Sequence, residues 1–261
     1  MDYQDNDGVR AEHQAEQDAP NERRSARNAT RFVRDRDTQV ADFEIIRAPD
    51  NGPLRTFNGG QKHENGWFAS RKGRRLLHWE GTSQLAFITR AEVDFNVVRV
   101  ATESVRFRFI GEDGWQEYTA DVELIGPDGK ITIVEIKRDE RDLADPQYKQ
   151  KLVAVGQLCN RQGWDFKIVF GRDVFCSLIH RRNVTLFASR AFVTIERRHE
   201  RRFEDLLEQN IRALTYGELA AVLEPGHPRW GEALVQALTV ARRVEIDLTQ
   251  PLFDATPLTL H

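Results

Sequence analysis

One predicted β-hairpin constrains the fold of this 261-residue chain more than any other feature. Two runs of strand-forming residues, 115–125 and 130–137, are separated by the sequence Gly-Pro-Asp-Gly at 126–129. Proline presets φ at such a turn and glycine permits a positive φ, so the pattern predicts two antiparallel strands. The second run is apolar on both faces from 131 to 134, which is typical of a central strand buried on both sides.

The residues around this hairpin predict an α/β or α+β fold. A helix is expected over 80–91 and a half-buried strand over 104–109, both before the hairpin. After it we expect a helix over 146–162, with Gly163 as its C-cap, and a fourth strand over 164–170. A helix, three strands, a helix and a strand in this order favour a mixed central sheet flanked by helices.

Composition and charge divide the chain into three predicted parts. Residues 1–45 are polar and aperiodic, and we expect a disordered charged arm. Residues 46–195 hold the α/β domain, with a loop-rich approach over 46–70 and regular structure from near Arg75. A charged joint begins at residue 196, and residues 196–261 form a smaller domain. Helices over 203–214, 216–223 and 230–242, followed by a strand over 244–248, give this domain a winged-helix outline.

Cysteine usage and hydropathy favour a cytoplasmic protein. Cys159 and Cys176 are the only cysteines and are far apart, which is typical of a reducing compartment and argues against a disulfide framework or a zinc ribbon. The sequence has no apolar run long enough for a membrane span, and its first residues lack the apolar stretch of a signal peptide. We therefore expect no membrane association.

Local basic clusters make DNA a candidate partner, although the net charge of −3 does not. Basic side chains beside aromatic rings suit phosphate contact and base stacking, and a solvated charge run is the alternative. The candidates for DNA contact are Arg71, Lys72, Arg74 and Arg75, which follow Trp67 and Phe68, and Lys149 and Lys151 on the predicted helix.

The hairpin also carries the residues that point to chemistry. Strand side chains alternate between faces, so Glu135 and Lys137 project together, and Asp121 lies on the paired strand. Two carboxylates can hold Mg²⁺, and a backbone carbonyl near Ile136 can add a ligand. The ion would polarise a phosphodiester and activate water, while Lys137 would position that water and stabilise the developing charge. The alternative is a solvated Glu-x-Lys strand end.

These residues resemble the PD-(D/E)XK nuclease superfamily. The pattern Asp121…Glu135-Ile136-Lys137 matches its core, with Ala120 in place of the usual proline. More narrowly, residues 60–250 resemble TnsA, the endonuclease subunit of heteromeric transposases. Three further segments carry this resemblance: Gly66-Trp67-Phe68 through Arg75, Trp79-Glu80, and Glu103-Ser104-Val105-Arg106-Phe107.

The resemblance implies a specific activity and specific partners. It implies an endonuclease that uses Mg²⁺, for which Mn²⁺ can substitute, and that cuts DNA at transposon ends. A separate transposase subunit and an AAA+ ATPase regulator would be its partners. The C-terminal domain would dock partners or DNA.

The resemblance also implies a third carboxylate on the helix before the hairpin. The position that matches the family's acid is Gln84, and Glu80 lies one turn earlier. We expect Glu80 to face the metal, because a carboxylate binds a hard cation better than an amide does, and Gln84 is the alternative. His78 is close in sequence, but a lone histidine is usually structural or exposed.

Two other interpretations of the chain's function remain open. One is a restriction or phage-defence nuclease with the same core. The other is a non-catalytic DNA- or partner-binding module on a nuclease fold. The presence of Asp121, Glu135 and Lys137 argues against the second reading, and the glutamine at 84 argues for it.

Overall fold

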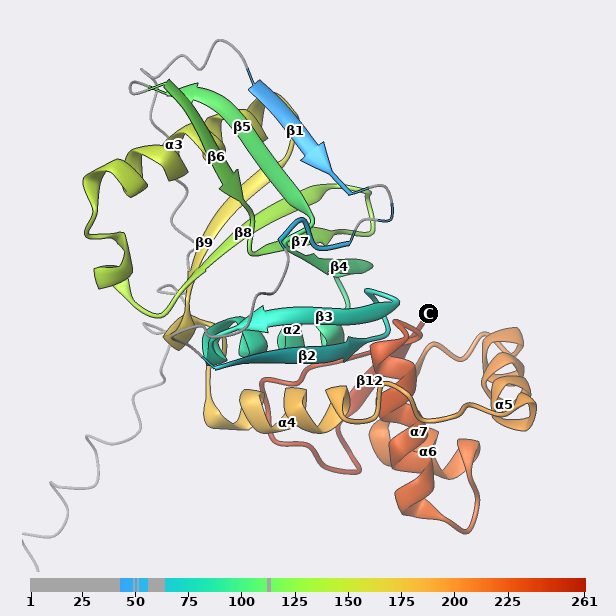
Figure 1. Cartoon of the computed structure of the whole chain (residues 1–261). Coiled ribbons are helices and arrows are strands. Elements are labelled where there is room, and N and C mark those ends of the chain that lie inside the picture. The colour runs from blue at the N-terminus through green and yellow to red at the C-terminus, as the bar shows by residue number, and fades with distance from the viewer. Residues whose placement is uncertain (1–42, 49, 51, 56–63, 112–113) are drawn as a thin grey trace, which may run out of the picture.

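The computed structural model describes residues 43–48, 50, 52–55, 64–111 and 114–261. Over these residues the fold is mixed α/β with several sheets (Figure 1). Most of the predicted N-terminal arm lies outside the described residues. Its last positions, however, belong to strand β1 (Phe43–Arg47), so the prediction of disorder is wrong for Phe43–Ile45.

A four-stranded sheet in the order β4-β7-β8-β9 forms the centre of the fold. Strand β8 is parallel to β9, and the other neighbours are antiparallel, so the sheet is mixed as predicted. The central position predicted for β8 is confirmed. The strands are β4 (Arg99–Thr102), β7 (Val122–Ile125), β8 (Ile131–Lys137) and β9 (Asp165–Phe170).

Side chains of β8 alternate between the two faces of this sheet, so the strand contributes to an apolar core on each face. Val134 and Ile136 pack into a core that includes Ile88 of helix α2 (Thr82–Val93). Ile133 points to the opposite face, toward a core built on helix α3 (Pro146–Arg161). Because strand residues alternate between faces, Glu135 and Lys137 project on the same face as Ile133, toward α3.

A second sheet, in the order β1-β5-β6, packs on the α3 side. It contains β5 (Val105–Gly111) and β6 (Gly114–Thr119). The chain passes between the two sheets at Glu103–Ser104 and again at Ala120–Asp121, so the single strand predicted over 115–125 is wrong. The Glu103 amide donates to the Asp121 carbonyl at 3.2 Å, which joins the two crossings, and Glu103 has a φ of 51°.

The segment predicted as a loop over 46–70 contains the first strand of a hairpin instead. Strand β2 (Asn65–Ser70) pairs with β3 (Arg75–Glu80), so regular structure begins before Arg75. The buried Glu92 fixes the turn between them by accepting from Ser70 Oγ and Arg71 N, each at 2.6 Å. The helix predicted over 80–91 begins at Thr82, which leaves Glu80 at the end of a strand.

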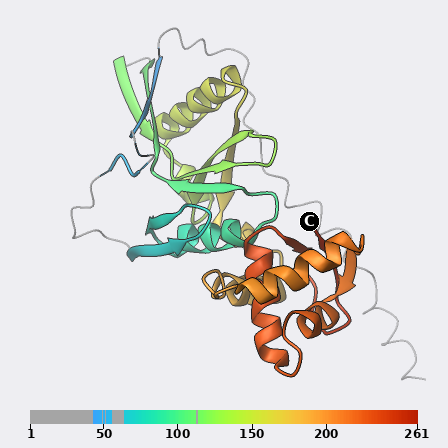
Figure 2. The same cartoon turned by 90° about the vertical axis from the view of Figure 1, so that its right-hand side faces the viewer.

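The C-terminal part is mainly helical and has its own core (Figure 2). That core includes Val184 and Phe187 of α4, a helix that the sequence pattern does not predict and that precedes the predicted boundary at residue 196. Strands β10, β12 and β11 form a small antiparallel sheet in that order. The elements are α4 (Leu178–Ala188), α5 (Arg197–Glu208), β10 (Ala213–Thr215), α6 (Tyr216–Leu223), α7 (Pro228–Val240), β11 (Val244–Ile246) and β12 (Pro257–Leu260).

Short 3₁₀ turns cover Glu140–Leu143 and Gly171–Asp173. Among the described residues, no helix combines the length and apolar character that a bilayer crossing requires.

Close packing of α6 on α7 depends on Gly231. A Cβ built at this position lies 2.2 Å from the Ala220 carbonyl oxygen, which is backbone and cannot rotate away. We expect Gly231→Ala to destabilise the protein by about 2–3 kcal/mol, despite alanine's better helix propensity. This loss corresponds to a fall in Tm of about 5–10 °C in thermal unfolding. Arg229→Ala, at an exposed position of the same helix, is the control. An unchanged Tm for Gly231→Ala would contradict the packing described.

Candidate metal-dependent active site

A cleft of about 830 Å³ opens where the two sheets, β3 and the start of α2 meet. Asp121, Glu135, Ile136 and Lys137 line it together with Glu80, so the structure brings the predicted core residues to one place. Six acidic and four basic residues line the cleft. The acidic ones are Glu64, Glu80, Glu117, Asp121, Glu135 and Asp142, and the basic ones are Arg55, Lys137, Arg138 and Lys151.

Asp121 lies at the crossing from β6 to β7, in line with Glu135 on the neighbouring β8. Its Oδ2 accepts from the Ile136 amide at 2.7 Å. Burial and the nearby Glu135 carboxylate raise the pKa of Asp121 to about 8, against opposing effects of the Ile136 amide and Lys137. Asp121 and Glu135 are thus two neighbouring carboxylates with too few positively charged groups around them to balance both negative charges.

Glu135 is buried and accepts hydrogen bonds from two phenols. Tyr118 Oη, on β6, donates to Oε2, and Tyr148 Oη, on α3, donates to Oε1. Burial and Glu135 raise the pKa of both tyrosines above the usual range, so both remain neutral donors. Neither tyrosine was predicted to contact Glu135, because no local signal shows that β6 and α3 meet there.

Lys137 extends into the cleft beside Glu135. Its Nζ lies 2.5 Å from Glu135 Oε1 and 4.7 Å from the centre of the Tyr148 ring. The side chain is 18% exposed, so the ammonium is oriented by these contacts and still faces the cleft. A cation held in this way can contact an anionic substrate at the cleft wall.

The peptide of Ile136 completes the arrangement. The N–H and C=O groups of one strand residue point to the same edge of the strand. Since the Ile136 N–H points to Asp121, its C=O points to the same edge, beyond the last β7–β8 pair, Val122–Val134. Ile136 also lines the cleft. The role of this carbonyl as a metal ligand stays a prediction.

The two candidates for the third ligand, Glu80 and Gln84, lie in different environments. Gln84 is buried, and its amide is used at both ends: Oε1 accepts from the Glu80 N–H at 2.6 Å and Nε2 donates to the Asp121 carbonyl at 3.3 Å. Gln84 therefore positions the backbone of two cleft residues. Glu80 offers its carboxylate to the cleft, but from the end of β3, so the prediction that the two share a helix face is wrong.

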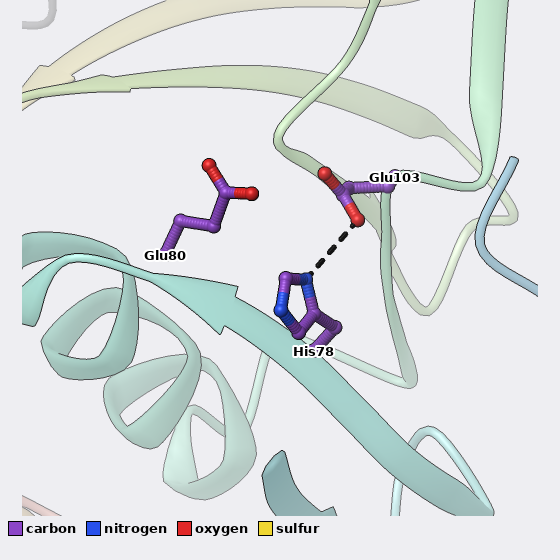
Figure 3. A group of neighbouring side chains, drawn as sticks. All are labelled: His78, Glu80 and Glu103. Atoms are coloured by element: carbon purple, nitrogen blue, oxygen red, sulfur yellow. Dashed lines mark hydrogen bonds and ion pairs between the residues drawn. The ribbon is translucent and has the colours of Figure 1, made fainter. Parts of the chain in front are cut away.

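Next to Glu80 lies a group that includes two residues outside the predicted site. His78, Glu80 and Glu103 each place one possible ligand atom within 4.8 Å of the others (Figure 3). His78 Nδ1 lies 3.3 Å from Glu103 Oε2, and both residues are buried. An i, i+2 spacing on a strand would have linked His78 to Glu80, but nothing local predicts that Glu103 joins them.

The predicted DNA contacts lie in different environments. Lys72 is buried, and its ammonium donates to the Ala91 and Asp94 carbonyls at 3.1 and 2.5 Å, so it is not available to DNA. Arg71 donates to the Ala191 carbonyl at 3.0 Å, and Arg75 pairs with Asp50. Arg74 is exposed at the turn.

The Arg71–Arg75 turn is at the far end of the β2–β3 hairpin from Glu80, roughly 16 Å away along β3. On α3, Lys149 is exposed, whereas Lys151 lines the cleft itself. Arg55 and Arg138, which the sequence analysis did not single out, also line it. Of the four basic residues that line the cleft, Lys137 and Lys151 were therefore predicted as site residues, and Arg55 and Arg138 were not.

The oxygen atoms that could act as metal ligands in the cleft suit a hard divalent cation. Carboxylate and backbone carbonyl oxygens are the ligands that Mg²⁺ prefers, and Asp121, Glu135, Glu80 and Ile136 supply them. A carboxylate has about four acceptor positions, and Glu135 uses three for Tyr118, Tyr148 and Lys137, which leaves one, on Oε2. The excess of acidic over basic side chains also favours a cation in this cleft.

Comparison of the sequence with models of known protein families finds no match, and comparison with curated proteins finds none either. We therefore infer the function of the cleft from its own geometry.

Proposed function

We propose that this protein is a metal-dependent DNA endonuclease with a PD-(D/E)XK core. The observation that carries the proposal is the convergence of Asp121, Glu135 and Lys137 with the Ile136 peptide at one wall of a cleft. The mixed sheet with α2 on one face and α3 on the other supports the same core.

In this proposal each residue of the chain has a defined task. Asp121 and Glu135 hold the cation, and Tyr118 and Tyr148 keep the Glu135 carboxylate in place as neutral donors. A bound Mg²⁺ ion supplies Lewis-acid polarisation of the phosphate and a lower pKa for water. Lys137 orients the attacking water and stabilises charge on the phosphate, and Glu80 adds a carboxylate at the cleft wall.

We further propose that the substrate is DNA at transposon ends, cut in company with a transposase subunit and an AAA+ regulator. This part of the proposal comes from the resemblance to TnsA. Arg55, Arg138 and Lys151 offer cations for phosphate contact at the cleft. A restriction or phage-defence nuclease would use the same core on different DNA.

The C-terminal part is proposed as a winged-helix-like domain that docks a partner. The order α5, β10, α6, α7, β11, β12 and the sheet order β10-β12-β11 support this class. In such domains the third helix commonly enters the DNA major groove. Here α7 is buried from Ala233 to Val240 and packs on α2, α4 and α6, so partner docking is favoured over groove reading.

The test is nicking of supercoiled plasmid and of DNA that carries the transposon ends of the native locus, with and without the neighbouring proteins. Reactions contain Mg²⁺, Mn²⁺ or EDTA, and Asp121→Ala protein is run in parallel. Metal-dependent nicking that Asp121→Ala loses is the expected result. A requirement for the native ends and neighbouring proteins supports the transposon substrate, and cutting of any plasmid without them supports the defence nuclease.

One observation favours a non-catalytic module as the second candidate. Glu135 already accepts from two tyrosines and a lysine, as a purely structural carboxylate would. Folded protein that binds DNA but cuts under none of these conditions would support this second function and reject the nuclease.

A further inference from the structure

His78, Glu80 and Glu103 form a group of metal-ligand side chains that lies beside the proposed nuclease centre and is chemically different from it. One ligand atom from each falls within 4.8 Å of the others. His78 is 5% exposed and Glu103 6% exposed, so this is not a patch of solvated surface acids. The set combines an imidazole with two carboxylates, whereas the Asp121–Glu135 centre offers oxygen alone.

The backbone holds these three side chains in place from two directions. His78 and Glu80 are two residues apart on β3 and share one face, opposite Trp67 and Asn65 of β2. Glu103 faces them from the crossing between β4 and β5 (Figure 3). Its amide donates to the Asp121 carbonyl at 3.2 Å and its carbonyl accepts from Leu54 at 2.8 Å. The geometry is therefore set by the fold.

Charge at this group is also favourable to a cation. Glu80 and Glu103 bring two carboxylates together. Besides His78, Glu103 pairs with Arg55, whose guanidinium is 3.6 Å away and whose side chain is 52% exposed. An exposed arginine compensates a buried carboxylate weakly, because solvent screens it.

Glu80 connects the two centres. It belongs to the His78–Glu103 group and also lines the cleft with Asp121 and Glu135. Its amide is bonded to Gln84, which in turn donates to the Asp121 carbonyl. A cation at the His78–Glu103 group would therefore be open to the cleft in which the oxygen-only pair lies.

We propose that His78, Glu80 and Glu103 bind a second divalent cation. Because imidazole suits Mn²⁺ and Zn²⁺ better than Mg²⁺, this site should prefer the transition metals, while the Asp121–Glu135 centre accepts Mg²⁺. The proposal does not require nuclease activity. If the protein is a nuclease, the site places a second cation next to the first, with Glu80 as their shared carboxylate.

The test is pulsed EPR of Mn²⁺ added to the chelator-treated full-length protein, which detects a coordinated imidazole by its ¹⁴N coupling. Wild-type protein and Asp121→Asn should both show the coupling at saturating Mn²⁺. His78→Gln should lose it, and His227→Gln, at an exposed histidine outside the group, should keep it. Circular dichroism checks that each variant is folded.

Glu80→Gln provides an independent variant at a half-buried position, in case His78→Gln does not fold. It should keep the ¹⁴N coupling but weaken Mn²⁺ binding about tenfold or more. The proposal is overturned if wild-type protein shows no ¹⁴N coupling, if the coupling survives in His78→Gln, or if Glu80→Gln binds Mn²⁺ with unchanged affinity. A ¹⁴N coupling without plasmid nicking would reject the nuclease and support this metal site. Plasmid nicking without the coupling would support the nuclease and reject this metal site.

Discussion

Replacing Lys137 with alanine should lower the single-turnover rate of Mg²⁺-dependent DNA nicking by about 10²–10³-fold. The ammonium lies in the cleft beside Glu135 and is oriented by that carboxylate and the Tyr148 ring. In the proposed mechanism, its removal takes away the group that stabilises charge on the phosphate. Tyr118 and Tyr148 still hold Glu135, so metal binding should remain measurable.

Lys130→Ala is the matched control for this variant. Lys130 immediately precedes β8, at the opposite end of the strand from Lys137, and pairs with Asp165 at 2.9 Å. A partly exposed pair of this kind contributes little, so the nicking rate should change by no more than about twofold. Equal losses of activity in the two variants would mean that Lys137 acts through folding or overall charge instead of through the site.

The second large effect is expected on the stability of the metal-free protein. Burial and Glu135 raise the pKa of Asp121 to about 8, above its ordinary value of 3.8. A carboxyl whose pKa is raised by folding stabilises the folded state fully below the ordinary pKa, and this contribution is lost as the pH rises toward 8. The wild-type protein in EDTA should therefore lose stability between about pH 4 and pH 8.

Asp121→Asn removes this ionisation and keeps an oxygen that can accept from the Ile136 amide. In EDTA the variant should be more stable than wild type at pH 8, by on the order of 2 kcal/mol relative to the difference at pH 5. Thermal unfolding would report this as about 4–8 °C in Tm. Saturating Mg²⁺ should restore the stability of the wild-type protein at pH 8 and should have little effect on the stability of the variant. A variant less stable than wild type at pH 8 in EDTA would contradict the close carboxylate pair.

The sequence predicted the centre of the fold because its signals are local. The Pro-Asp-Gly turn and the doubly apolar run at 131–134 correctly place β8 inside a mixed sheet. Helix α6 was predicted with its observed bounds, because Thr215 and Glu218 form the capping box that starts it.

The errors arise where tertiary contacts decide the structure. Residues 115–125 have continuous strand character, but the chain changes sheets at Ala120–Asp121, and no local pattern marks that crossing. Turn-forming residues around residue 66 led to the prediction of a loop where strand β2 lies. The turn of the β2–β3 hairpin is fixed by Glu92, which is buried and distant in the sequence. Lys72 resembled a surface cation, but the carbonyls at the end of α2 bind its ammonium.

The candidate site shows the same division. Strand alternation predicts that Glu135 and Lys137 project together, and the hairpin turn predicts that Asp121 lies on the neighbouring strand. The residues that position them could not, because Tyr118, Tyr148 and Glu103 come from three other segments. Gln84 was considered as a ligand because it matches the acid position of the family that the chain resembles, and only the hydrogen bonds of its amide identify it as a positioning residue.

The central claim is that the cleft around Asp121, Glu135 and Lys137 hydrolyses DNA with a divalent cation. The most direct measurement is the rate of supercoiled-plasmid nicking in Mg²⁺ by wild-type protein and by Lys137→Ala protein purified in the same way, with EDTA added to a parallel set. We predict nicking by the wild type in Mg²⁺, none in EDTA, and almost none by the variant. Nicking at the same rate by both proteins would contradict the account, because the activity would then come from elsewhere.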